Sequence, residues 1–143
     1  MTVKAILSRK GGDVATIAPT ASLTDAVKLL AQRRIGAIVI TGPDSRVAGI
    51  LSERDIVRAV AERGHAALDD NVGAVMTRKV ATCTEADTIA SLMERMTEGK
   101  FRHLPVVDQG RLVGVISIGD VVKWRVEEIE GESNALREYI ATA

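Results

Sequence analysis

The chain has 143 residues, of which 46% are hydrophobic and 27% charged, the balance of a folded globular protein rather than of a disordered one. Its 19 basic and 19 acidic residues cancel, and only Phe101, Trp124 and Tyr139 are aromatic, which argues against nucleic acid as a partner because such proteins need a basic field and stacking side chains. We find neither a signal-peptide pattern nor an apolar run of about 18 residues, so we expect no membrane partner and a cytoplasmic protein.

The first half of the chain predicts a short strand, a helix and a strand hairpin that leads into a second helix. The short strand is expected at residues 14–17, and Ser22 is placed to cap the helix after it. The apolar runs 35–40 and 47–51 predict the hairpin, and the second helix begins at Ser52. The first helix has apolar side chains at helical spacing, namely Leu23, Ala26, Val27, Leu30 and Ala31.

The second half repeats this unit. The two repeats differ in length only where Gly, Pro or Asp residues indicate loops, since the first repeat alone contains Gly11-Gly12-Asp13 and has a longer loop at residues 41–46. The aligned segments are 3–10 with 72–79, 14–40 with 80–106, and 49–55 with 114–120. The expected elements of the second repeat are a short strand at 80–83, a helix capped by Thr88, strands at 103–107 and 112–116, and a helix from Ser117.

Four short motifs resemble those of the cystathionine-β-synthase (CBS) domain. They are Gly49-Ile-Leu-Ser-Glu-Arg-Asp55, Gly114-Val-Ile-Ser-Ile-Gly-Asp120, Arg102-His-Leu-Pro-Val-Val107 and Gly36-Ala-Ile-Val-Ile40. The resemblance implies an α+β fold of two CBS-type βαββα repeats, packed as an intramolecular pseudo-twofold pair. We place the first repeat with an N-terminal helix at residues 1–66, the second repeat at 67–126, and a C-terminal helical tail at 127–143.

The same resemblance implies a free-standing sensor that binds an adenine nucleotide in the cleft between its repeats and is not an enzyme. AMP, ATP, NAD(H) and S-adenosylmethionine are the ligand class, and an unknown regulated protein receives the signal. No residues are left over for a catalytic barrel. We also expect a homodimer, because each repeat presents amphipathic helices that the other repeat cannot wholly cover. The alternative is a structural or scaffolding dimer whose pockets do not bind.

The two Ser-x-x-Asp motifs allow two interpretations. Ser52 with Asp55, and Ser117 with Asp120, have the spacing of helix N-terminal caps. A carboxylate one turn into a helix can also accept the hydroxyls of a ribose while the helix N-terminus faces phosphate. Because the motif occurs in both repeats, we favour ribose binding by Asp55 and Asp120.

Further ligand-binding residues follow from the resemblance. Thr16 and Thr82 lie in the segment that faces adenine in this family, although ordinary strand threonines remain an equal alternative. Gly36 and Ala37 are small residues on a buried strand, which indicates either tight packing or a place where a base can approach the backbone. Arg102 and His103 stand at the same places in the second repeat. We expect Arg54, Arg102 and His103 to converge on phosphate, because only one repeat supplies each of them. Pro105 completes the set of candidate binding residues.

Cysteine and histidine chemistry predicts neither catalysis nor a metal site. Cys83 and His103 lack an orienting third group, and a lone cysteine is often a small buried hydrophobe. With His65 as the only other histidine, a dedicated transition-metal site is not expected. We therefore assign no catalytic residue, no metal ligand and no catalytic cofactor.

Overall fold

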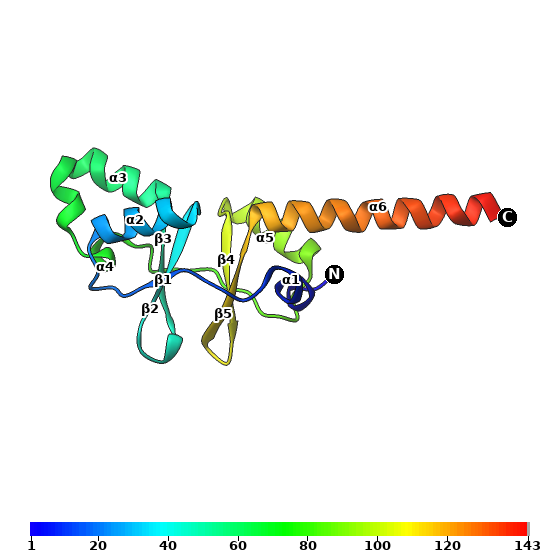
Figure 1. Cartoon of the computed structure of the whole chain (residues 1–143), viewed down its shortest axis with the longest axis horizontal. Coiled ribbons are helices and arrows are strands. Elements are labelled where there is room, and N and C mark those ends of the chain that lie inside the picture. Colours follow the sequence, from blue (N-terminus) through cyan, green and yellow to red (C-terminus); the bar gives the residue numbers. More distant parts are fainter. Residues whose placement is uncertain (143) are drawn as a thin grey trace.

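The computed structural model describes residues 1–142, which form two α+β repeats side by side and one long helix that leaves the body (Figure 1). The first sheet has the strand order β1-β2-β3 and the second consists of β4 and β5. The elements of the first half are α1 (Val3–Lys10), β1 (Thr16–Ile17), α2 (Leu23–Arg33), β2 (Ala37–Thr41), the 3₁₀ turn η1 (Pro43–Ser45), β3 (Val47–Ser52), α3 (Glu53–Arg63) and the 3₁₀ turn η2 (Gly64–Asp69).

The second half has the same order of elements with two differences at its start. Its elements are α4 (Val72–Val75), α5 (Ile89–Gly99), β4 (His103–Asp108), β5 (Arg111–Ser117) and α6 (Ile118–Thr142). Helix α4 is shorter than its counterpart α1, and the strand expected at 80–83 is reduced to a single parallel bridge between Cys83 and Val106. The hairpins agree with the expected ones to within two residues at each end.

The helices begin and end where the side chains provide caps. The Ser22 hydroxyl accepts a hydrogen bond from the backbone N–H of Asp25 at 3.1 Å, and the Thr88 hydroxyl plays the same part for α5. Each cap satisfies an N–H group that the first helical turn leaves open, which stabilises a helix by about 1 kcal/mol. Both helices end at a residue in the left-handed conformation, Arg34 for α2 and Lys100 for α5. The two repeats therefore share their backbone geometry as well as their sequence pattern.

The hydrophobic cores do not follow the two halves of the sequence. Val3 and Ile6 of α1 are fully buried in the core of the second repeat, and Val72 and Met76 lie in the core of the first. Matching backbone hydrogen bonds fix this exchange, because the N–H of Val3 donates to the carbonyl of Asp87 and the N–H of Val72 donates to that of Ala21. The fold is thus a pseudo-twofold pair in which each repeat supplies a helix to the core of the other.

Helix α6 extends the second repeat far beyond the body (Figure 1). Its first turns are anchored by the buried Val121 and Trp124, whereas every residue from 129 to 142 is exposed. The expected tail at 127–143 continues this helix without a break as far as the structure describes it. None of the helices within residues 1–142 has the length and hydropathy of a membrane span.

Candidate functional site

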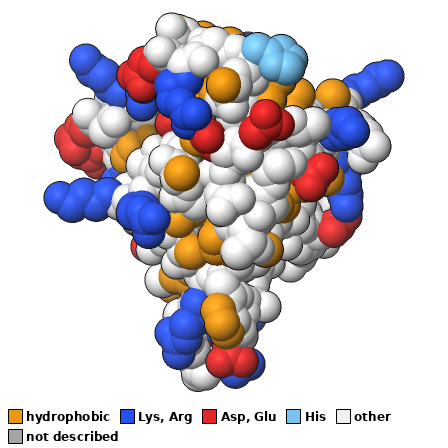
Figure 2. Space-filling model, turned by 90° about the vertical axis from the view of Figure 1, so that its left-hand side faces the viewer, with side chains coloured by type: hydrophobic (Ala, Val, Ile, Leu, Met, Phe, Trp, Pro, Cys, Tyr) orange, Lys and Arg blue, Asp and Glu red, His pale blue; other side chains and the backbone are white. Residues whose placement is uncertain are grey.

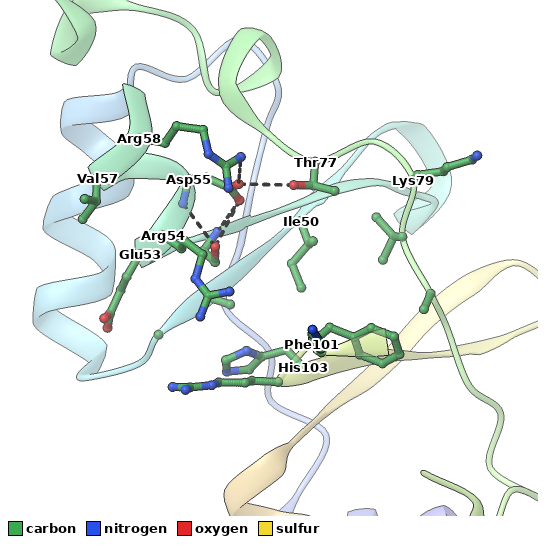
Figure 3. A pocket seen from close by; sticks show the side chains of 17 residues that line it. Ile50, Glu53, Arg54, Asp55, Val57, Arg58, Thr77, Lys79, Phe101 and His103 are labelled. Atoms are coloured by element: carbon green, nitrogen blue, oxygen red, sulfur yellow. Dashed lines mark hydrogen bonds and ion pairs between the residues drawn. The ribbon is translucent and has the colours of Figure 1, made fainter. Parts of the chain in front are cut away.

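A cavity of about 710 Å³ lies between the two repeats (Figure 3). It is bounded by the starts of β2 and α3, by the extended segment 77–81, and by residues 100–103 at the start of β4. Cavities of several hundred Å³ are typical of sites for small molecules and cofactors. Its lining residues are Gly36, Ala37, Ile50, Ser52, Glu53, Arg54, Asp55, Val57, Arg58, Thr77, Lys79, Val80, Ala81, Lys100, Phe101, Arg102 and His103.

The carboxylate of Asp55 is the most constrained polar group of this cavity. It is only 7% exposed, and its Oδ2 accepts hydrogen bonds from the backbone N–H and the hydroxyl of Ser52 at 2.9 and 3.2 Å. Ser52 is both the last residue of β3 and the cap of α3, so strand and helix together fix the carboxylate. The second oxygen, Oδ1, accepts a hydrogen bond from the Thr77 hydroxyl at 3.3 Å and lies 3.7 Å from Nη1 of Arg58. The capping interpretation is therefore correct for Asp55, and a role in ribose binding would be additional to it.

Positively charged and titratable groups gather on the other side of the cavity. Arg102 and His103 open β4, and His103 pairs with Ser117 in the hairpin as Ala37 pairs with Ser52. The starts of β2 and β4 are neighbours, because a Cβ added to Gly36 would lie 3.6 Å from Cε1 of His103. Figure 3 shows Arg54 extending from the start of α3 toward His103, whereas Lys79 points away.

The imidazole of His103 is half-buried in a strongly charged neighbourhood. Burial and the Lys10 ammonium hold the pKa of His103 below its usual range of about 6.5, and Arg102 adds to this effect. The carboxylates of Asp120 and Glu53 oppose the shift without cancelling it. His103 is consequently neutral at neutral pH in the unliganded protein.

The Ser-x-x-Asp motif of the second repeat has the same cap but a different neighbour. Oδ2 of Asp120 accepts hydrogen bonds from the N–H and hydroxyl of Ser117 at 2.9 and 3.0 Å. The same oxygen lies 2.5 Å from Nζ of Lys10 at the end of α1. Burial alone would raise the pKa of Asp120, but the hydrogen bonds from Lys10 and Ser117 outweigh burial and lower it. The second carboxylate is thus neutralised by the chain itself.

The two sites differ because the aligned residues 8–10 and 77–79 take different paths. Ser8-Arg9-Lys10 and Thr77-Arg78-Lys79 are aligned, yet the first is helical and the second is extended. Thr77 forms an antiparallel bridge with Ile50 and so lines the Asp55 cavity. In the first repeat the additional residues 11–13 let α1 continue to Lys10 and still reach β1. Gly11 ends that helix with φ of 91°, a conformation that side-chain-bearing residues rarely adopt.

The cavity brings together seven of the predicted binding residues and leaves five outside. Gly36, Ala37, Ser52, Arg54, Asp55, Arg102 and His103 line it, whereas Thr16, Thr82, Pro105, Ser117 and Asp120 do not. Thr16 is exposed on β1, and the carbonyl of Thr82 accepts a hydrogen bond from Arg95 at 2.7 Å. Pro105 is buried in the middle of β4.

The sequence did not lead us to predict most of the cavity residues that come from the segment 77–81 and from α3. Thr77 hydrogen-bonds Asp55, and residues 79–81 form one wall of the cavity, whereas for this part of the chain we predicted only that the segment around Thr82 faces adenine. Phe101 and Val57 add apolar surface to the same space. The alignment of Ser8 with Thr77 could have indicated this role. Because α4 packs on the first repeat, the residues that follow α4, including Thr77, also lie beside the first repeat.

The lone thiol is unsuited to nucleophilic chemistry. Burial raises the pKa of Cys83 to about 12, with Asp87 adding to the shift and Arg95 opposing it. A thiol with this pKa is almost entirely protonated at neutral pH, and the thiolate is the nucleophile. Within residues 1–142 we find no group of three or more His, Cys, Asp or Glu residues that could hold a metal ion.

Comparison with known proteins identifies both repeats. The family model described as "CBS domain" matches residues 3–62 and again 72–127. A CBS domain-containing mitochondrial protein of Arabidopsis thaliana is 37% identical over 120 residues, which are 81% of this chain and 58% of that protein. The chain thus spans somewhat more than half the length of this relative.

Solved structures agree with this comparison over nearly the whole chain. A CBS-domain containing protein from Agrobacterium tumefaciens is 50% identical, with a TM-score of 0.84 over 87% of this chain and 99% of that one. A CBS domain protein from Pyrobaculum aerophilum, complexed with AMP, is 32% identical, with a TM-score of 0.74 over 84% and 89% of the two chains. A CBS domain pair in complex with 5-methylthioadenosine and S-adenosylmethionine is 25% identical, with a TM-score of 0.79 over 90% and 98%.

Proposed function

The chain belongs to the CBS domain family, and on that premise we propose that it is a regulatory module that binds an adenine nucleotide between its repeats and performs no catalysis itself. The observation that carries the proposal is the cavity, which combines one buried carboxylate, arginines from both repeats and apolar walls. The AMP complex of one similar structure and the S-adenosylmethionine complex of another support the ligand class.

Asp55 is the group that suits a ribose. Its carboxylate is held in one orientation by the backbone N–H of Ser52, and ribose hydroxyls would take the place of the longer hydrogen bonds from the Ser52 and Thr77 hydroxyls, at 3.2 and 3.3 Å. Hydrogen bonds to a charged acceptor are stronger than neutral ones, at about 1.5–3 kcal/mol each. The ribose is therefore placed at the start of α3, whose N-terminus faces the same space.

The phosphate end is assigned to Arg54, Arg102 and His103. Arg54 comes from α3, His103 is the first residue of β4 and Arg102 directly precedes it, so a phosphate between them would contact both repeats at once. Guanidinium groups bind phosphate oxygens through paired hydrogen bonds. This concentration of cationic groups favours AMP or ATP over S-adenosylmethionine, whose sulfonium is itself positive. NAD(H) remains within the proposed class because it carries the same adenosine and phosphate groups.

Apolar surface is available for the adenine ring. Ile50, Val57 and Phe101 line the cavity together with Val80 and Ala81. A base placed among them would remove apolar surface from water, which stabilises the complex by about 25 cal/mol for each Å² buried. Residues 80 and 81 lie on this side, directly before Thr82, and we propose that the backbone of this segment contacts the adenine ring.

A signal must leave this module through a protein surface. Helices α2 and α3 form an apolar groove of about 410 Å³ that includes Val27, Ile35 and Val57. We propose that a second copy of the chain covers it in a homodimer, and that a regulated protein responds to the liganded form. At this end of the molecule Lys, Arg, Asp and Glu side chains are mixed, with apolar side chains between them (Figure 2). Because the charges are mixed, this face lacks the uniformly positive surface that binds the phosphate backbone of nucleic acid.

Titration calorimetry with AMP, ATP, NADH, S-adenosylmethionine and adenosine tests the proposal. We expect AMP or ATP to bind most tightly and adenosine more weakly, because adenosine lacks the phosphate that the arginines contact. A thermal-shift assay provides an independent readout, since a ligand at about 100 times its Kd adds about 2.7 kcal/mol of stability. A protein that binds none of the five at millimolar concentration would instead be a scaffolding dimer with non-functional pockets.

A further inference from the structure

The exposed part of α6 carries a continuous apolar seam. Its apolar residues follow the alternating spacing of four and three that defines the a and d positions of a coiled coil. Only Ser133 interrupts the series. The seam positions are Val122, Val126, Ile129, Ser133, Leu136 and Ile140, and each of the five apolar side chains is about half exposed or more.

The seam lies on a different face of α6 from the one that packs on the body. Val121 and Trp124 point into the core of the second repeat, and Glu128 pairs with the N-terminal amine. At 100° per residue the seam is turned well away from these positions. From Val122 to Ile140 it runs for about 27 Å at 1.5 Å per residue.

A helix of this kind is poorly stable without a partner. Residues 129–142 make no buried contact, and isolated helices shorter than about 12–15 residues are marginal in water. Gly131 lowers the helix propensity further. A partner that covers the seam therefore stabilises the helix as well as burying its apolar side chains.

The charges beside the seam identify the partner. In a parallel two-stranded coiled coil each g position faces the e position five residues later on the other helix. Arg125 would then face Glu130, and Glu132 would face Arg137, so that both kinds of pair join opposite charges. Each pair occurs twice in a symmetric dimer.

An antiparallel arrangement of the same seam is unfavourable. When Val122 lies opposite Ile140, the g positions of the two helices (125, 132 and 139) face each other, and so do the e positions (123, 130 and 137). Glu130 would face its own copy, Glu132 would do the same, and Lys123 would face Arg137. Every charged pair of this kind is repulsive, so the sequence selects the parallel orientation.

We propose that residues 122–140 of α6 form a parallel, in-register coiled coil with a second copy of the chain. The a positions hold Val126, Ser133 and Ile140, and the d positions hold Val122, Ile129 and Leu136. Both sets are mainly β-branched, so it is the paired charges at e and g, rather than the seam itself, that specify the parallel pair. In the view of Figure 1 helices α2, α3 and α6 all run along the upper edge of the molecule, and a twofold axis parallel to α6 would bring the first repeats of the two copies to the same end of the dimer. The coiled coil thereby fixes which repeats face each other in the dimer.

Disulfide cross-linking of the full chain tests the orientation directly. Ser133→Cys places two thiols opposite each other only in the parallel register, within the Cα separation of 4.4–6.8 Å that a disulfide allows. Asn134→Cys is the matched control, one residue further on and outside the seam. Cys83 is 2% exposed and can be retained. We expect a covalent dimer for Ser133→Cys in a glutathione buffer and none for Asn134→Cys. Equal cross-linking of both variants, or of neither, would overturn the proposal.

A charge exchange gives a second test that does not depend on a new cysteine. Glu132→Lys and Arg137→Glu each convert two attractive pairs into repulsive ones, which we expect to weaken self-association about tenfold. The double variant restores opposite charges and should recover to within about threefold of the original. A 1:1 mixture of the two single variants should form heterodimers in preference to either homodimer. If the double variant instead self-associates more weakly than either single variant, the proposal is contradicted.

This inference and the nucleotide site can fail independently. Cross-linking reports on α6, whose seam shares no residue with the cavity. AMP calorimetry on the Asn134→Cys protein reports on the cavity alone. A protein that cross-links through residue 133 but binds no nucleotide would refute the proposed function and leave the coiled coil standing.

Discussion

The two Ser-x-x-Asp sites have identical caps and opposite surroundings. Asp55 and Asp120 both accept the N–H and hydroxyl hydrogen bonds of a serine at the end of a strand. Asp55 then lines a cavity, whereas Asp120 pairs with Lys10. The motif thus determines the helix cap, whereas the surroundings of the carboxylate depend on residues outside the motif, Thr77 for Asp55 and Lys10 for Asp120.

The largest expected effect comes from removing Arg54 and Arg102, the two arginines assigned to phosphate. We predict that the double variant Arg54→Ala/Arg102→Ala weakens AMP binding about 100-fold, because each loses a charged hydrogen bond worth about tenfold or more. Adenosine binding should be nearly unchanged, and calorimetry with both ligands measures the difference. Arg46→Ala, in the hairpin loop outside the cavity, is the control. Equal losses for adenosine and AMP would mean that the arginines do not contact phosphate.

Replacing the two carboxylates separately tests the comparison itself. Asp55→Asn should weaken both AMP and adenosine about tenfold, since it removes the charge that strengthens hydrogen bonds to the ribose hydroxyls. Asp120→Asn should leave this affinity unchanged, because Asp120 lies outside the cavity. Calorimetry of both variants at the same protein concentration gives the ratio of their dissociation constants for AMP. If the two variants lose the same affinity, the sites are equivalent despite Lys10.

Freeing Asp120 should produce a second binding event. Lys10→Met removes the ammonium that lies 2.5 Å from Oδ2 and leaves the Ser117 cap intact. We expect a weaker second phase in an AMP titration that the unmodified chain does not show. Deleting residues 11–13, which makes the first connecting segment as short as the second, should have the same result. Unchanged stoichiometry in both variants would show that Lys10 is not what separates the sites.

Much of the fold could be predicted from the sequence because the signals are local. The apolar spacing of α2, the caps at Ser22 and Thr88 and the turn residues of the hairpins depend only on near neighbours along the chain. The motif glycines also follow from close packing, since a Cβ at Gly49 would lie 2.6 Å from Sδ of Met76. The CBS-type repeat and its α+β fold were therefore confirmed.

The site was only partly predictable because it depends on contacts between distant segments. That α1 packs on the second repeat and residues 77–81 on the first follows from the exchange of helices, which no local pattern encodes. Lys10 and Lys79 occupy aligned positions with similar flanking residues, yet one neutralises Asp120 and the other points into solvent. The roles of the individual binding residues stay predictions.

The serine caps should contribute equally in both repeats. Ser52→Ala and Ser117→Ala each remove the hydroxyl that accepts from the N–H of the aspartate three residues later, at 3.3 and 3.2 Å. We expect each to lower the free energy of unfolding by about 1 kcal/mol in urea denaturation. Equal losses would show that the two Ser-x-x-Asp sites have the same structural role, so that any difference between them lies in ligand binding. A difference well above 1 kcal/mol between the variants would contradict equal capping.

The smallest expected effect concerns His103, whose pKa is influenced by the carboxylates of Asp120 and Glu53. Burial and Lys10 lower its pKa in the unliganded protein, so the neutral form is favoured and its contribution to stability is present above pH 6.5 and declines as the pH falls toward the lowered pKa. A bound phosphate favours the protonated imidazole and raises this pKa. AMP affinity should therefore increase a few-fold as the pH falls below about 6.5.

Protonation of the phosphate, with a pKa near 6, acts in the opposite direction and has to be separated from this effect. Calorimetry of His103→Gln from pH 5.5 to 8 gives the phosphate contribution alone, and the difference from the unmodified chain gives that of His103. The Lys10→Met variant adds a further test, because without the ammonium the pKa of His103 rises and the window moves to higher pH. If the two pH profiles of the unmodified and His103→Gln proteins coincide, the imidazole does not contact phosphate, and the phosphate end rests on Arg54 and Arg102 alone.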